Sequence, residues 1–203
     1  MKLFEQEKIE VLPSDGSAVY FGKILSEVES KHYFDMLIKN SDWKNDEAVI
    51  FGKHFITKRK VAWYGDEEYS YTYSNTQHDA LLWTTELLQL KRLTEKLSGY
   101  NFNSCLLNLY HDGNEGMGWH SDDEKSLAKD SAIASLSLGA ERKFMLRHKR
   151  TKETISLPLE NGSLLVMKEN TQANWLHSVP KTKKVKSPRI NLTFRSMLNS
   201  KAR

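Results

Sequence analysis

The spacing of hydrophobic residues divides the chain into an N-terminal part that contains helices and a C-terminal part made of strands. Ser26-Glu-Val-Glu29 matches a capping box, and the apolar residues that follow at helical spacing predict a helix that runs to about Lys39. A second apolar stripe predicts a helix from roughly Asp79 onward, and Gly99 is placed to end it. We expect both helices to buttress a sheet.

The segment between these helices has the pattern of β-hairpins. Residues 48–51 and 60–64 are short β-like runs punctuated by glycines, and Tyr71 and Tyr73 then alternate with small polar residues. This hairpin region covers about residues 45–75.

After Gly99 the chain consists of successive apolar runs separated by polar or glycine-containing turns. The strands predicted from these runs are residues 104–110, 132–138, 143–148, 154–157, 163–168, 175–179 and 189–194. Seven strands, with the helices confined to the N-terminal half, predict an α+β fold in which a jelly roll is covered on one side by helices. We expect one domain over residues 1–203, with the jelly-roll core at about residues 100–198.

Composition narrows the class of protein. The chain has 203 residues, of which 39% are hydrophobic and 28% charged, and this balance excludes a disordered or collagen-like protein. No apolar run approaches the roughly 18 residues of a membrane span, and acidic residues stand where a signal peptide would have its apolar core. We therefore expect neither membrane insertion nor export.

The cysteine count and the charge add two weaker indications. Cys105 is the single cysteine, which suits a reducing intracellular compartment: the cytoplasm in a bacterium or the nucleus in a eukaryote. The net charge of +4 permits a polyanionic partner without requiring one. The basic clusters at residues 147–152 and 181–186 have the ordinary interpretation of solvated loops.

A candidate metal site lies in the polar stretch after residue 110. His120 and Asp122 are two residues apart, so in an extended backbone both side chains project to the same face and can share one ion. His177 is a candidate third ligand. Two histidines and one carboxylate that leave open positions form the facial triad of non-haem Fe(II) oxygenases, whereas structural zinc needs four ligands. A catalytic zinc site remains an alternative.

The last predicted strand favours iron over zinc. Arg189, Asn191, Thr193 and Arg195 occupy alternate positions, so one face of the strand is polar and cationic while the other is apolar. Such a face beside a metal site would bind a small dianionic carboxylate, because arginine offers a planar fork to it. Zinc hydrolysis gives this face no role, whereas iron with an oxo-acid cosubstrate does.

These motifs together resemble the AlkB family of Fe(II)/2-oxoglutarate dioxygenases, over about residues 49–198. Within the family the chain closely resembles animal members that prefer double-stranded DNA, with which it shares Phe51-Gly-Lys, Tyr71-Thr-Tyr and Leu157-Pro-Leu. The resemblance implies a double-stranded β-helix, and a monomer that removes methyl groups from 1-methyladenine and 3-methylcytosine in duplex DNA. Fe(II), 2-oxoglutarate and O₂ would be required, and formaldehyde, succinate and CO₂ would be released.

The resemblance also implies roles for individual residues. The iron ligands would be His120, Asp122 and His177. The residues of the 2-oxoglutarate site would be Asn108, Tyr110, Asn191, Arg189 and Arg195. Base and DNA contacts would come from Tyr71, Tyr73, Asp123, Glu124, the hairpin tip Phe51-Gly52, Arg59, Lys60, Arg147, Lys183 and Lys184. Without the resemblance, the aromatic residues would be interpreted as packing and Arg195 as a structural ion pair to Asp122.

Two departures from the most similar members bear on the substrate. Tyr73 stands where they have phenylalanine, and the loop after residues 147–149 is shorter in this chain. The shorter loop leaves open a family member that acts on single-stranded DNA or RNA. A noncatalytic nucleic-acid-binding module that retains a metal site is a further alternative, which the intact ligands and arginines disfavour.

Overall fold

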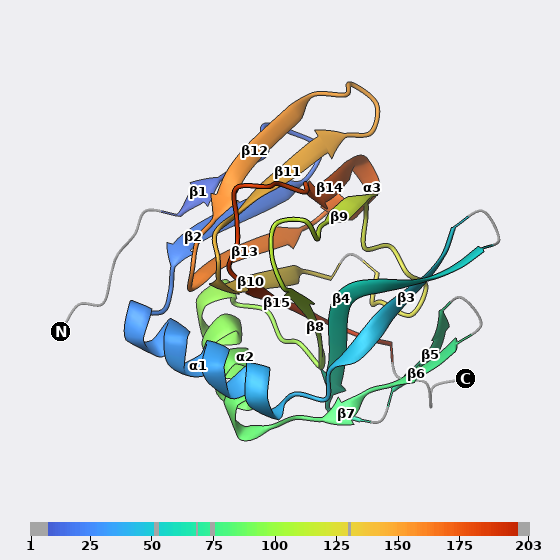
Figure 1. The fold of residues 1–203 in the computed structure, drawn as a ribbon. Coiled ribbons are helices and arrows are strands. Elements are labelled where there is room, and N and C mark those ends of the chain that lie inside the picture. The colour runs from blue at the N-terminus through green and yellow to red at the C-terminus, as the bar shows by residue number, and fades with distance from the viewer. Residues whose placement is uncertain (1–7, 51–52, 68, 74–75, 130, 199–203) are drawn as a thin grey trace.

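The computed structural model describes residues 8–50, 53–67, 69–73, 76–129 and 131–198, with the backbone alone described for residues 48–50, 53–55, 70–73 and 76–79. Within these ranges the strands form a nine-stranded major sheet, a four-stranded minor sheet and a two-stranded hairpin (Figure 1). The major sheet has the order β1 (Ile9–Glu10), β2 (Ser17–Lys23), β13 (Ser163–Lys168), β10 (Ile133–Gly139), β15 (Arg189–Arg195), β8 (Ser104–Tyr110), β4 (Lys53–Gly65) and β3 (Lys44–Ile50), with β7 (Leu81–Leu82) paired to β4.

The minor sheet has the order β12 (Thr154–Leu159), β11 (Arg142–His148), β14 (Trp175–Val179) and β9 (Met117–His120), and the hairpin is β5 (Ser70–Tyr73) with β6 (Thr76–Asp79). The two larger sheets confirm the predicted jelly roll. All seven strands predicted after Gly99 are present, with ends that differ by at most two residues from the prediction. The prediction missed β1, β2, β6, β7 and the short β9.

The two long helices lie next to each other along the major sheet (Figure 1). α1 (Glu27–Asn40) begins at the predicted capping box, where the Ser26 side chain accepts the Glu29 N–H and the Glu29 carboxylate accepts the Ser26 N–H. α2 (Thr85–Ser98) ends at Gly99, whose φ of +79° is a left-handed conformation that suits glycine.

The predicted start of the second helix, at about Asp79, is wrong. Thr84 is the N-cap of α2, since its hydroxyl accepts the Leu87 N–H, and the residues before it are extended. Leu81 and Leu82 lie in β7 beside β4, where both side chains are exposed instead of adding to the apolar stripe of the helix. A one-turn helix, α3 (Thr171–Asn174), leads into β14 and is an exception to the expected confinement of helices to the N-terminal half.

The major sheet has a different environment on each face because side chains alternate along its strands. In β10, Ala134, Leu136 and Leu138 belong to the core under α1 and α2, whereas Ile133 belongs to a second core against the minor sheet. The strands β8 and β15 follow the same rule. The residues of these two strands that belong to the core under the helices are Cys105, Leu107, Leu109, Ile190, Leu192 and Phe194.

Two further features of the fold concern the single cysteine and the lengths of the helices. Cys105 is 0% exposed, and burial raises the pKa of its thiol well above the ordinary value, so it is an unreactive core residue. Among the described residues, no helix is long and apolar enough to span a membrane.

The predicted hairpin near residue 50 is present as β3 and β4, and both strands are longer than predicted. β4 continues beyond β3 and pairs with β8, where Lys60 lies opposite Leu109 and Gly65 opposite Ser104. The β3–β4 hairpin is therefore part of the major sheet. The expected tip, Phe51-Gly52, lies outside the described residues.

Candidate iron and 2-oxoglutarate site

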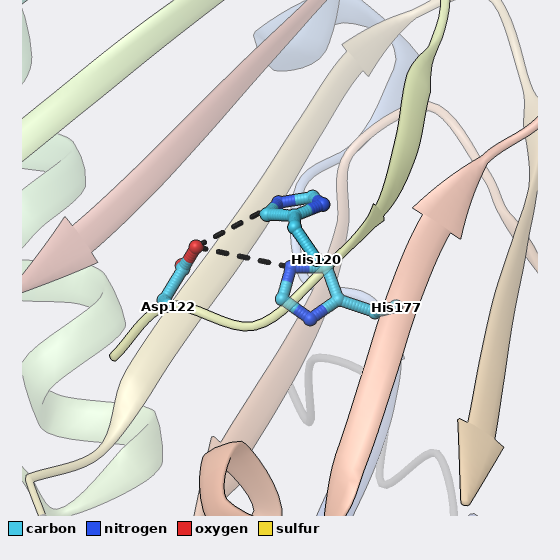
Figure 2. Close-up of side chains that lie close together, drawn as sticks. All are labelled: His120, Asp122 and His177. Carbon is cyan, nitrogen blue, oxygen red and sulfur yellow. Dashed lines mark ion pairs between the residues drawn. The ribbon is translucent and has the colours of Figure 1, made fainter. Parts of the chain in front are cut away.

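Three side chains that could hold a metal ion meet between the two sheets. The carboxylate oxygen Oδ1 of Asp122 is 3.7 Å from Nε2 of His120 and 3.9 Å from Nε2 of His177. One ligand atom from each residue lies within 4.8 Å of the others, and Figure 2 shows the three side chains pointing toward one another. This confirms that the three residues predicted from the sequence come together, and they could bind iron.

Different elements position these three side chains. His120 ends β9 and is opposite His177 of β14 in the ladder, so the two imidazole rings are 4.1 Å apart between centroids. Asp122 lies two residues beyond the end of β9. The extended strand that was expected to carry both ligands therefore includes His120 but not Asp122. Nδ1 of His120 is 2.9 Å from the Gly118 carbonyl and donates to it, which leaves Nε2 facing the site.

Burial and charge set the protonation states of the site. Burial alone would raise the pKa of Asp122, but the positive charge of Arg195, which donates a hydrogen bond of 2.9 Å to the carboxylate, holds that pKa below its ordinary value. Burial lowers the pKa of His177 from 6.5 to about 4, so its imidazole is neutral at pH 7. A carboxylate and neutral imidazoles are the forms in which these groups bind metals.

A layer of polar side chains from β8, β10 and β15 lies next to this cluster. Arg189 is opposite Tyr110, Asn191 opposite Asn108, and Thr193 opposite Ser135 in the ladders, so their side chains share the inner face of the major sheet. Hydrogen bonds join Asn191 to Ser135 at 2.8 Å and to Arg189 at 2.7 Å. The alternation predicted for the last strand is therefore confirmed, with its apolar face under the helices.

Arg189 is the most constrained charge in this layer. Arg189 is 1% exposed, and burial lowers the pKa of its guanidinium from 12.5 to about 10. The guanidinium therefore stays charged at neutral pH. Nη2 donates to Ser137 and Asn191, whereas Nε and Nη1 have no hydrogen-bond partner among the described residues. A buried cation with two unused donors needs an anion, and the same pocket holds the triad.

Comparison with known proteins agrees with this geometry. Residues 17–195 match a family model described as the 2OG-Fe(II) oxygenase superfamily. The human (Homo sapiens) DNA oxidative demethylase ALKBH2 is 39% identical over 194 residues, which cover 90% of this chain and 73% of that protein. The chain belongs to the AlkB family of Fe(II)/2-oxoglutarate dioxygenases.

The AlkB chain is also similar to a second relative and to a solved structure. The alkB homolog 3 of cattle (Bos taurus), named an alpha-ketoglutarate-dependent dioxygenase, is 40% identical over 83% of this chain, which spans 62% of the length of that protein. The solved structure of OsALKBH1 matches 92% of this chain and 99% of its own with a TM-score of 0.65. At 15% identity, that likeness shows the fold alone.

The residues of the AlkB site fit the cofactors that this superfamily implies. Two histidines and one carboxylate suit Fe(II) with open positions. The unused Nε and Nη1 donors of Arg189 suit one carboxylate of 2-oxoglutarate, and Asn108 has a buried side-chain oxygen without a hydrogen-bond partner among the described residues. Arg195 pairs with Asp122, as the simpler interpretation of the sequence allowed.

Most of the other predicted DNA contacts are near the rim or at the surface. Asp123 and Glu124 are exposed, and Oε1 of Glu124 is 3.5 Å from the Arg195 guanidinium. Lys183 and Lys184 are exposed as well, in the loop between β14 and β15. Arg147 lies on β11 with its guanidinium 4.2 Å from the centroid of the Trp119 ring.

The surroundings of Arg59 differ from the expected phosphate contact. Its side chain is 11% exposed, forms an ion pair with Asp46 and donates to the Met117 sulfur at 3.2 Å. Its guanidinium also lies 5.8 Å from the centroid of the Tyr110 ring. Sequence reasoning assigned Arg59 to the surface because β-strand alternation in a hairpin does not reveal which face is covered. In the structure this arginine is largely buried next to Asp46 and the Tyr110 ring.

The base-stacking residues remain a prediction. The backbone of β5 pairs Tyr71 with His78 and Tyr73 with Thr76, which confirms the extended strand that was predicted at the two tyrosines. The structure describes no side chain at these positions, and Phe51 with Gly52 lies outside the described residues.

Sequence reasoning missed several residues that surround the metal ligands. Phe144 stacks on His177 with centroids 5.5 Å apart, and Gln172 accepts the backbone N–H of Asp122 at 2.9 Å. Both residues are far from the ligands they contact in sequence, so no local motif marks them. The one signal in the sequence was that Gln172 lies only five residues before the predicted ligand His177.

Proposed function

We propose that this AlkB chain is an Fe(II)/2-oxoglutarate-dependent demethylase that repairs N-methylated bases in DNA, with 1-methyladenine and 3-methylcytosine as substrates. The observation that carries the proposal is the position of a fully buried arginine with two unused donors beside a His-Asp-His cluster. The printed names of two relatives, DNA oxidative demethylase and alpha-ketoglutarate-dependent dioxygenase, support the reaction class.

The reaction requires an oxidant that the protein itself lacks. When bound, Fe(II) with O₂ and 2-oxoglutarate supplies the oxidation: one oxygen atom enters succinate as CO₂ is lost, and the other enters the substrate N-methyl group. The resulting N-hydroxymethyl base then loses its hydroxyl proton, and its C–N bond breaks with the electron pair going to the ring nitrogen. The products are formaldehyde and the unmethylated base.

The chain's own residues would bind 2-oxoglutarate and iron and orient the groups that hold them. Arg189 would pair with the distal carboxylate of 2-oxoglutarate, and Tyr110 and Asn108 would hydrogen-bond to the same molecule. His120, Asp122 and His177 would hold iron, and Arg195 keeps Asp122 ionised by pairing with it. Ser137 and Asn191 orient the Arg189 fork by accepting hydrogen bonds from its Nη2.

Base recognition would use the exposed side of the site. A methylated base must be flipped out of a duplex to reach iron, at a cost of about a few kcal/mol, which is smaller for a lesion that already mispairs. Tyr71 and Tyr73 would stack on that base, and Asp123, with Glu124, would favour a cationic ring. Lys183 and Lys184 would add contacts to phosphates.

The preference for duplex DNA is part of the proposal and has a direct test. Formaldehyde release is measured on the same 1-methyladenine oligonucleotide as duplex DNA, single-stranded DNA and RNA, with Fe(II), ascorbate and 2-oxoglutarate present. We expect the duplex to have the highest kcat/KM. Preference for RNA or for single strands would favour the alternative, a family member of that specificity.

The hairpin tip gives a second, residue-level prediction. We expect Phe51→Ala to reduce duplex repair at least about tenfold more than single-strand repair, because an apolar wedge offsets unstacking that costs about a few kcal/mol. The ratio of the two kcat/KM values is the measurement. Ile56→Ala is a matched control, since Ile56 is an exposed apolar residue of the same hairpin and 62% accessible. Equal losses on both substrates would refute the wedge.

A noncatalytic nucleic-acid-binding module is the alternative from another class. It predicts oligonucleotide binding without formaldehyde release in the presence of all cosubstrates. We also propose that the protein is a monomer. Because its single cysteine is free and buried, we propose in addition that it acts in a reducing intracellular compartment, the cytoplasm or the nucleus.

A further inference from the structure

The candidate metal ligand Asp122 lies just after β9, in a segment that is not part of the β9–β14 ladder. β9 ends at His120, so the ladder between β9 and β14 fixes His120 and His177 but stops before Asp122. The buried backbone N–H of Asp122 instead donates to the side-chain oxygen of Gln172 at 2.9 Å. A side chain thus supplies the acceptor that a neighbouring strand would otherwise provide.

Gln172 is itself rigidly placed. It belongs to α3, where the neighbouring Thr171 is 1% exposed and its hydroxyl accepts the Ser17 N–H at 2.9 Å. A Cβ at Gly16 would lie 2.7 Å from that hydroxyl oxygen, which shows how closely α3 is packed against the start of β2. α3 continues directly into β14, the strand that carries His177. The segment formed by α3 and β14 therefore carries His177 in its own chain, and its Gln172 side chain also holds Asp122 by a hydrogen bond.

Lys149 joins the same arrangement from the turn after β11. Its ammonium donates to the Gln172 carbonyl at 2.8 Å and to the Ser121 hydroxyl at 3.2 Å. Its backbone N–H donates to the Asn174 carbonyl at 2.7 Å. Lys149 thus bridges α3 and the residue that precedes Asp122.

We infer that Gln172 and Lys149 are positioning residues that hold the segment of residues 121–122 in the geometry that binds the metal. Neither residue belongs to the lining of the pocket that holds the triad, so each would act through Asp122. The inference rests on the proposed function, because it assumes that Asp122 is a ligand. Removing a residue that orients a metal ligand typically weakens metal affinity about 10- to 100-fold.

The test is a titration of the full chain with Mn(II), followed by the electron paramagnetic resonance signal of the free ion. We expect Gln172→Met and Lys149→Met each to raise the dissociation constant about tenfold. Two controls remove neighbouring groups without contact to residues 121–122. Asn174→Ala removes an amide from the same helix, and Lys152→Met removes a lysine of the same turn that donates to the Lys149 carbonyl. Both should bind Mn(II) like the parent, to within about twofold.

The double variant and the stability of the metal-free protein complete the design. Because both side chains act on one segment, Gln172→Met with Lys149→Met should cost less than the product of the single effects. The urea midpoint of each metal-free variant separates loss of fold from loss of affinity. Unchanged affinity in Gln172→Met, with normal binding by the parent, would overturn the inference. Failure of the parent to bind Mn(II) would instead overturn the proposed function.

Discussion

Replacing Asp122 with alanine is expected to abolish iron-dependent formaldehyde release while the fold is kept. Asp122 supplies the one carboxylate of the cluster, and its Oδ1 lies within 3.9 Å of both histidines. Losing a residue that merely orients a ligand costs about 10- to 100-fold in metal affinity, so losing the ligand should cost at least about 100-fold. Mn(II) titration and formaldehyde release measure the two consequences.

The control for this variant is Asp35→Ala, which removes an exposed carboxylate on α1 that pairs with Lys31. It should bind metal and turn over like the parent. Circular dichroism and the urea midpoint establish that the Asp122 variant is folded. Retained turnover in the folded variant would eliminate the proposed triad.

Replacing Arg189 with methionine is expected to weaken 2-oxoglutarate binding at least about 30-fold, because truncating one partner of a buried charge pair costs about 2–5 kcal/mol. Methionine keeps the buried volume but removes the two donors, Nε and Nη1, that have no hydrogen-bond partner in the part of the chain that the structure describes. The rise in the KM for 2-oxoglutarate is the measurement. Mn(II) affinity without 2-oxoglutarate should be unchanged, because Arg189 is not a metal ligand.

Arg189→Lys separates charge from geometry. Lysine keeps the positive charge and loses the planar fork, so its KM should fall between those of the parent and the methionine variant. An unchanged KM in Arg189→Met would mean that the cosubstrate binds elsewhere.

The last strand shows why so much of the site could be predicted from sequence. Strand alternation is a local property. In the last strand every second residue from Arg189 to Arg195 is polar, and the residues between them are Ile190, Leu192 and Phe194. That contrast identifies the inner face without knowledge of the partner strands. His177 was a candidate because it lies in the predicted strand of residues 175–179, and the family resemblance assigned it to the metal.

The missed features depend on contacts between distant segments. β9 has only four residues and follows a glycine-containing loop, so its pairing with β14 decides its structure more than its own sequence does. Leu81 and Leu82 continue the apolar pattern of α2, yet pairing with β4 and the Thr84 cap assign them to a strand. Arg59 was misplaced because Asp46 and Tyr110, which cover it, come from other strands.

The two faces of the major sheet also bear on how this scaffold could change its chemistry. In β8, β10 and β15, the residues that pack under α1 and α2 are separated by a single step from those that face the pocket. Substitutions on the pocket face therefore leave the helix contacts in place. A new cosubstrate or substrate could be accommodated by exchanging a few alternate residues, while the neighbours between them continue to stabilise the domain.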